Sequence, residues 1–233
     1  MKHLISTILI ILLFLQFRTT VFASEAEQNL FSNPIVGEDA IAILEEEALD
    51  VTDPGKMQDS IRCFAVSEDG KVAIGTQNAS NARVLILDTD GTILSAYAFD
   101  CDSEFGVLFL NNDLSIYYNR SQRIILYDAE GNAKAAYAIP SSGECTELAT
   151  QIMEATQIER NGIMYKLERD IKFDDREYCR LIKYVDNQQR TVLYDVTNFH
   201  NLRVVACYTG LVLFVLFWIG FAMQKVKHDR TMQ

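Results

Sequence analysis

Residues 86–99 read ILDTDGTILSAYAF and residues 126–139 read LYDAEGNAKAAYAI, and these two stretches decide the fold. At a constant offset of 40 residues, both contain an aspartate, a glycine three residues later, and then an Ala-Tyr-Ala triplet. Self-similarity at a fixed period of about 20–50 residues indicates one supersecondary unit copied along the chain. The matched turn positions are Asp88 with Asp128 and Gly91 with Gly131.

Short apolar segments flank these turns and predict β-strands, because they are rich in β-branched and aromatic residues and are bounded by turn residues. The first copy has four such segments (63–66, 72–75, 84–87, 92–99), the second has four (107–110, 114–118, 124–127, 133–139), and a looser third has three (163–167, 179–185, 191–195). Asp186 stands in the third copy where Asp88 and Asp128 stand in the others. Four antiparallel strands in about 40 residues form the unit of a propeller blade.

The Asp-x-x-Gly element is interpreted as a turn and not as a calcium loop. The calcium loop needs its glycine at the sixth position and a glutamate at the twelfth, whereas Gly91 comes earlier. Aspartate opens such a turn by accepting hydrogen bonds from its own backbone, and glycine supplies the positive φ. We therefore assign structural roles at turns to Asp88, Gly91, Asp128, Gly131 and Asp186.

The strand–Asp-x-x-Gly–strand element resembles NHL-type and related bacterial β-propeller repeats over about residues 60–195. The resemblance implies a mainly β fold, an incomplete propeller-like stack of about three four-stranded antiparallel blades. These blades would cover about 60–100, 101–140 and 158–196. Closed propellers typically have four to eight blades, so this chain departs from the family in blade count. Such folds host many functions, and the resemblance implies no particular activity.

An open stack exposes unpaired backbone groups at its outer strands, which something must cover. One candidate is an acidic N-terminal strap over 24–59, in which residues 25–59 carry ten acids and one base. A second is a helical insert over about 143–156, which begins with the capping pattern Ser141-x-x-Glu144. A third is a second copy of the chain, which would make a homodimer.

The two ends of the chain predict a single-pass type I membrane protein. Residues 1–23 have a basic start, an apolar core and a Val-Phe-Ala end, typical of a cleaved signal peptide; an uncleaved N-terminal anchor is the alternative. Residues 203–223 predict a transmembrane helix, because 204–223 carry no charge and about 20 apolar residues span a bilayer. Basic residues in 224–233 predict a cytoplasmic tail, which leaves residues 60–202 as the extracytoplasmic β domain.

The charge of the chain excludes some partners. The formal net charge is −11, and residues 24–202 hold 15 Lys and Arg against 31 Asp and Glu. A nucleic-acid binder needs a basic face, so no nucleic-acid partner is expected. The acidic charge is interpreted as favouring solubility outside the membrane. The alternative interpretation is that it serves to bind a cationic or metal-binding partner.

Four cysteines fall in the exported region, where an oxidising environment permits disulfides. Chain proximity alone suggests the pairs Cys63–Cys101 and Cys145–Cys179, with free buried thiols as the alternative. Cys207 lies in the predicted span and is interpreted as a small packing residue.

The sequence contains no convincing catalytic, metal or cofactor motif. His200 is the single exported histidine and lies next to the predicted span, so we expect no catalytic residue, metal ligand or cofactor. The predicted function is a non-catalytic module that binds or senses a protein or ligand outside the membrane. The alternatives are an extracytoplasmic hydrolase with paired carboxylates and a structural subunit of a membrane complex.

Overall fold

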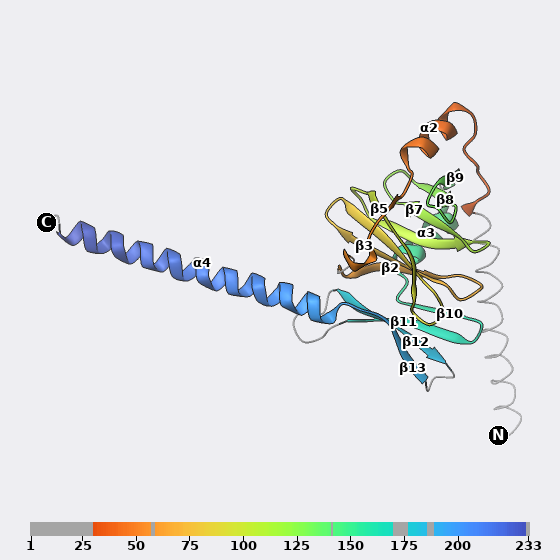
Figure 1. Cartoon of the computed structure of the whole chain (residues 1–233). Coiled ribbons are helices and arrows are strands. Elements are labelled where there is room, and N and C mark those ends of the chain that lie inside the picture. The colour runs from red at the N-terminus through yellow and green to blue at the C-terminus, as the bar shows by residue number, and fades with distance from the viewer. Residues whose placement is uncertain (1–29, 57–58, 141, 170–176, 186–188, 232–233) are drawn as a thin grey trace, which may run out of the picture.

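The computed structural model describes residues 30–56, 59–140, 142–169, 177–185 and 189–231, with the backbone alone at Lys56, His200, Val204 and 220–231. The predicted signal peptide (1–23) and Asp186 lie outside the described residues. The prediction of mainly antiparallel β-structure with a C-terminal apolar helix is confirmed. Figure 1 shows a β-rich body from which one long helix projects.

The body is built from three four-stranded antiparallel units, each formed by consecutive strands. Unit 1 contains β2 (Ile61–Val66), β3 (Val72–Asn78), β4 (Asn81–Leu87) and β5 (Ile93–Asp100). Unit 2 contains β6 (Phe105–Leu110), β7 (Asp113–Tyr118), β8 (Arg123–Tyr127) and β9 (Ala133–Ala138). Unit 3 contains β10 (Gln157–Arg160), β11 (Ile163–Arg169), β12 (Tyr178–Val185) and β13 (Gln189–Asp195).

Units 1 and 3 form one continuous sheet, which differs from the expected separate blades. The connection is a single antiparallel bridge between Tyr178, at the start of β12, and Ile61, at the start of β2. Unit 2 forms its own four-stranded sheet. Strand β10 is also additional to the three strands predicted for the third copy, because its sequence, Gln-Ile-Glu-Arg, has one apolar residue.

Unit 1 lies between the other two units and is buried on both faces. Side chains alternate across a strand with a period of two. On β3, Ala73 therefore packs in the core shared with unit 2, and its neighbours Val72 and Ile74 pack in the core shared with unit 3. Both faces of this sheet need apolar residues, which explains the nearly continuous apolar run of β4.

The two homologous turns have the same geometry in units 1 and 2. Gly91 and Gly131 have φ of 91° and 88°, and their amides donate to the carbonyl oxygens of Asp88 and Asp128. The carboxylate of Asp128 also accepts hydrogen bonds from the backbone of residues 130 and 132. The chain therefore reverses direction at each turn with its backbone amides hydrogen-bonded.

The N-terminal strap pairs with the outer strands of two units. Its first part runs beside β9, where the amide of Ile35 donates to the carbonyl of Ala136 at 2.8 Å. The chain then forms helix α2 (Glu38–Glu46), strand β1 (Asp50–Val51) and a 3-10 turn, η1 (Pro54–Lys56). Strand β1 pairs antiparallel with β5. The strap thus satisfies backbone groups at the free edges of units 1 and 2.

Helix α3 (Gly143–Glu154) follows unit 2 and covers its outer face. The side chain of Ser142 caps it by accepting a hydrogen bond from the amide of Cys145, whereas Ser141 of the predicted capping pattern lies outside the described residues. The helix ends before the predicted residue 156, because β10 begins at Gln157. Its buried residues pack with Leu30 of the strap in a third apolar core.

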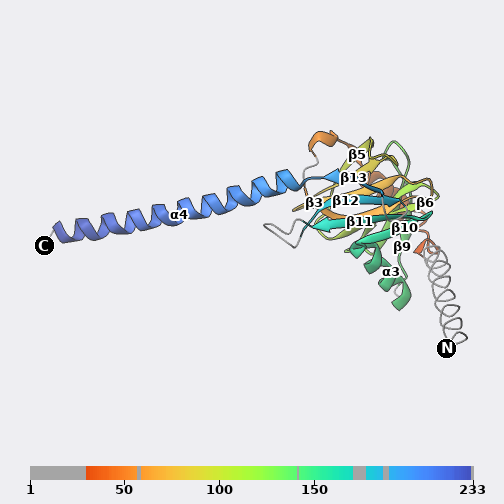
Figure 2. The same cartoon turned by 90° about the horizontal axis from the view of Figure 1, so that it is seen from below.

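Helix α4 (Thr197–Thr231) is longer than the predicted span of 203–223. It starts directly after β13 and continues without a break through residues 224–231 of the predicted tail. Figure 2 shows that it projects away from the body beyond its first turns.

The five cysteines are free thiols in the structure, without the suggested pairs Cys63–Cys101 and Cys145–Cys179. Cys63, Cys101, Cys145 and Cys179 are buried thiols, the alternative considered for them. Burial raises the pKa of the Cys63 thiol to about 12, so this group stays neutral in the core.

We predict that Gly75→Ala destabilises the fold. A Cβ at residue 75 would lie 2.5 Å from the Cys63 sulfur and 2.9 Å from the Phe105 ring, where unit 2 packs on β3. Overpacking of this kind costs about 1–3 kcal/mol. The measurement is urea unfolding of the full chain in detergent micelles, followed by near-ultraviolet circular dichroism of the buried tyrosines. Gly143→Ala is the matched control, because its Cβ meets no atom within 4 Å; equal midpoints for the two variants would contradict the prediction.

Candidate functional site

A polar cleft of about 530 Å³ opens where units 1 and 2 meet helix α3. Its walls come from the start of β2, the end of β3, the link between β5 and β6, and the end of α3. The lining residues are Arg62, Gln77, Ala79, Asp102, Ser103, Glu104, Phe105, Met153 and Glu154. The cleft therefore combines charges of both signs with the apolar side chains of Ala79, Phe105 and Met153.

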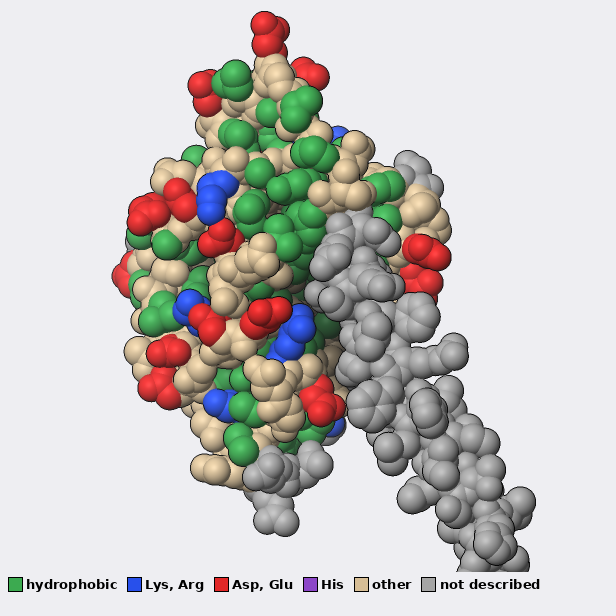
Figure 3. Space-filling model, turned by 90° about the vertical axis from the view of Figure 1, so that its right-hand side faces the viewer, with side chains coloured by type: hydrophobic (Ala, Val, Ile, Leu, Met, Phe, Trp, Pro, Cys, Tyr) green, Lys and Arg blue, Asp and Glu red, His purple; other side chains and the backbone are tan. Residues whose placement is uncertain are grey.

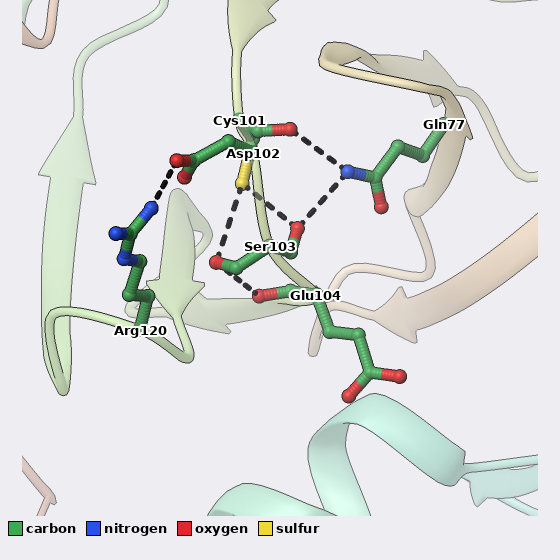
Figure 4. A network of polar contacts seen from close by, with 6 residues as sticks. All are labelled: Gln77, Cys101, Asp102, Ser103, Glu104 and Arg120. Carbon is green, nitrogen blue, oxygen red and sulfur yellow. Dashed lines mark hydrogen bonds and ion pairs between the residues drawn. The ribbon is translucent and has the colours of Figure 1, made fainter.

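One glutamine fixes the link between β5 and β6, which forms a wall of the cleft. The side-chain amide of Gln77 donates to the carbonyl oxygens of Cys101 at 2.9 Å and Ser103 at 3.0 Å (Figure 4). The amide of Cys101 donates to the carbonyl of Ser80 at 2.7 Å, and its thiol donates to the carbonyl of Ser103 at 3.1 Å. These bonds hold the link in one conformation across the junction of the two units.

The far side of the link is held by the β7–β8 turn of unit 2. The amide of Asn119 donates to the carbonyl of Glu104 at 3.1 Å. Arg120 forms an ion pair with Asp102, seen at the left of Figure 4. Both side chains are exposed, so this pair positions the Asp102 carboxylate more than it stabilises the fold.

Three charged groups remain available in the cleft. Arg62, Glu104 and Glu154 are exposed, and none forms an ion pair within the part of the chain that the structure describes. An arginine offers a planar set of donors for an anion, and two carboxylates accept hydrogen bonds from a cation. The arrangement can therefore bind a ligand that carries both charges.

A second polar cluster joins the strap to unit 2. Glu47 follows α2 and hydrogen-bonds the Tyr118 hydroxyl, which lies 2.9 Å from the Tyr127 hydroxyl. Burial raises the pKa of Glu47, and the bond to Tyr118 opposes this shift. Burial also raises the pKa of Tyr118 well above its usual value. Glu47 is not among the residues that line the cleft.

The structure separates the residues singled out by sequence from this cleft. Asp88, Gly91, Asp128 and Gly131 lie at turns and line no part of it. Cys101 contributes its backbone and a thiol bond to the cleft wall. Among the described residues, no group of three His, Cys, Asp or Glu side chains could hold a metal ion.

Sequence reasoning missed Arg62, Gln77 and Glu154. Each is an ordinary polar residue in its own segment, and no local pattern distinguishes it. The cleft forms only when β2, β3 and the end of α3 meet, so no signal within one segment could have revealed it.

No family model and no curated protein matches this chain. Among solved structures, the selenomethionine-substituted virginiamycin B lyase from Staphylococcus aureus is similar with a TM-score of 0.28 and 16% sequence identity. The similarity covers 62% of this chain and 44% of that one, so the chain spans less than half of that structure's length. A likeness of this size says nothing about activity or ligand.

We predict a pH-dependent difference between Glu47→Gln and the wild type. Because the pKa of Glu47 is raised in the folded state, the folded protein binds this proton more tightly than the unfolded chain does. Its contribution to stability is thus present below the unfolded pKa and is lost as the pH rises through the folded value. The free energy of unfolding of the variant should improve relative to wild type from about pH 4 to about pH 7.

The measurement is urea unfolding at both pH values, with the full chain in detergent micelles. Glu45→Gln is the control, since it removes one exposed charge from the last turn of α2, two residues before Glu47. A wild-type-minus-variant difference that is the same at both pH values for Glu47→Gln would contradict the prediction.

Proposed function

We propose that this chain is a single-span membrane protein whose extracytoplasmic β domain binds a ligand without catalysis. The observation that carries the proposal is α4, in which Thr197–Ile219 is apolar, long enough to cross a bilayer and unburied by the body. Its large side chains are open to the surroundings, with Phe217 71% and Trp218 62% exposed. In water such a surface would be unstable, and a lipid bilayer would cover it.

The orientation is type I in this proposal. A cleaved signal peptide at 1–23 would export the body, and Lys225, Lys227 and Arg230 would stay in the cytoplasm. Arg203, on the outer flank, is accounted for by its ion pair with Asp59 of the body at 2.9 Å. This cation serves the fold of the exported part and does not argue for the opposite orientation.

The three units are interpreted as blades of an incomplete propeller-like stack of the NHL-related kind. Support comes from the consecutive order of strands in each unit and from the repeated Asp-x-x-Gly turn. The strap at β5 and β9 supports a monomeric body, because two outer edges are already paired. A homodimer would have to form elsewhere, for example at β13.

A binding role is favoured over the hydrolase alternative by the positions of the carboxylates. The raised pKa of Glu47 belongs to a carboxyl in the strap, bonded to Tyr118. The cleft residues Glu104 and Glu154 line the same polar cavity as Arg62. Binding sites commonly combine such a cavity with a few convergent polar groups.

We expect the body to be labelled from outside intact cells. Ser80→Cys places an exposed thiol in the β3–β4 turn, and Thr231→Cys places one at the far end of α4. A membrane-impermeant maleimide should label the first in intact cells and the second only after permeabilisation. The native cysteines give a low background, since four are buried and Cys207 would lie in the bilayer. If only Thr231→Cys were labelled in intact cells, the orientation would be the opposite one and the proposal would be wrong.

Anchoring by α4 is tested separately. Leu213→Arg with Leu216→Arg should move the protein from the membrane fraction to the soluble fraction, since each arginine near a span centre costs about 2.5–3.5 kcal/mol. Leu213→Ala with Leu216→Ala is the control and should stay in the membrane fraction. Retention of the arginine variant in membranes would show that α4 is not the anchor.

A further inference from the structure

Helix α4 is joined to the body without a linker. The amide of Val196 donates to the carbonyl of Cys179 at 3.0 Å, and the carboxylate of Asp195 accepts from the amide of Thr197 at 2.8 Å. The first of these bonds ties the chain to β12, and the second caps the helix as it leaves β13. The helix therefore starts from a fixed point on the sheet.

A second contact holds the first turns of α4 against the body. Arg203 donates to Asp59 at 2.9 Å, and Asp59 also accepts from the side chain of Asn78 at 3.4 Å. Asn78 is the last residue of β3, directly after Gln77 of the cleft. The joint thus fixes α4 relative to the strand that carries part of the cleft wall.

The strand registers place the cleft at the same end of the body as α4. Tyr178, at the start of β12, pairs with Ile61, and Ile61 pairs with Thr76 near the end of β3. Arg62 and Gln77 of the cleft are the next residues on these two strands. Figures 1 and 2 show α4 leaving one end of the body, and Figure 3 shows the opposite end.

The remaining cleft wall lies at that end too. Asp100, the last residue of β5, pairs with Asn81 at the start of β4, and the link 101–104 follows it. Thr197 to Arg203 spans about 9 Å of helix at 1.5 Å per residue. If the hydrocarbon region begins near residue 204, this end of the body lies at the level of lipid headgroups, whose layer is several Å thick.

We propose that the cleft binds the zwitterionic headgroup of an amine-bearing phospholipid of the phosphoethanolamine type, a proposal that rests on the membrane topology above. The phosphodiester would pair with Arg62, and the ammonium would donate to Glu104 and Glu154. Both interactions are charge-assisted hydrogen bonds, and the ligand must carry a positive and a negative group to form them together. The excess of carboxylates disfavours anionic headgroups, and a quaternary ammonium lacks the hydrogen-bond donors that the carboxylates could accept.

The test uses the full chain in detergent micelles with dioctanoyl phosphatidylethanolamine, phosphatidylcholine or phosphatidylglycerol. Each lipid is titrated, and the thermal midpoint is followed by near-ultraviolet circular dichroism. A ligand that binds only the native state raises this midpoint by an amount that grows with the ratio of ligand concentration to Kd, so the titrations compare the three affinities. We expect apparent affinity for the ethanolamine lipid to exceed that for the other two by roughly tenfold, the worth of one charge-assisted hydrogen bond. Equal shifts with the three lipids would overturn the proposal.

Variants locate the effect in the cleft. Arg62→Gln and the double variant Glu104→Gln with Glu154→Gln should each lose the preference for the ethanolamine lipid. Glu144→Gln, at the other end of α3, should keep it. Retention of the preference in the cleft variants would assign the lipid to another surface and overturn the proposal.

Soluble glycerophosphoethanolamine separates the two sources of this headgroup. A shift equal to that of the lipid at the same concentration would mean a soluble ligand and would overturn the membrane source. The maleimide experiment distinguishes failure of the headgroup proposal from failure of the proposed membrane orientation. If Ser80→Cys is labelled from outside but no lipid preference is found, the anchored binding module stands and the headgroup proposal fails.

Discussion

The burial of unit 1 on both faces is the constraint on which the rest of the structure depends. Strands β3 and β4 supply one core with Ala73 and Val84 and the opposite core with Ile74 and Leu85. A register slip of one residue would exchange these two sets, and each core would receive side chains of the wrong size. At Gly75 even a methyl group has no space, because unit 2 places Phe105 against this strand. The sheet therefore fixes how the two outer units pack.

Surfaces of the sheets that no other unit covers are covered by segments from elsewhere in the chain. Unit 2 receives α3 and Leu30 on its outer face, and the strap pairs with its last strand, β9. The outer edge of unit 1 receives β1. These additions remove much of the exposed edge and face that a short row of four-stranded units would otherwise present to aggregation.

Sequence alone predicted the strands of units 1 and 2 and the Asp-x-x-Gly turns, because these depend on local alternation and on the φ preference of glycine. It also identified the apolar helix and the start of α3 near Gly143. It did not predict the pairing of the strap, the bridge from Tyr178 to Ile61 or the cleft, since each joins segments that are distant along the chain. Chain proximity alone could not choose between disulfides and the free thiols that the structure has, because pairing depends on side-chain geometry.

At the start of α4, the ion pair of Arg203 with Asp59 attaches the helix to the body. An arginine beside a span normally favours the cytoplasmic side, yet Arg203 is bound to Asp59, whose side chain is only 16% exposed. Partial burial of Asp59 strengthens the pair relative to an exposed one, and the bond from Asn78 adds a second constraint on the carboxylate. With Asp195 capping the helix, α4 cannot swing freely about the end of β13. In the proposed topology, a body held in this way would keep the end that carries the cleft turned toward the bilayer.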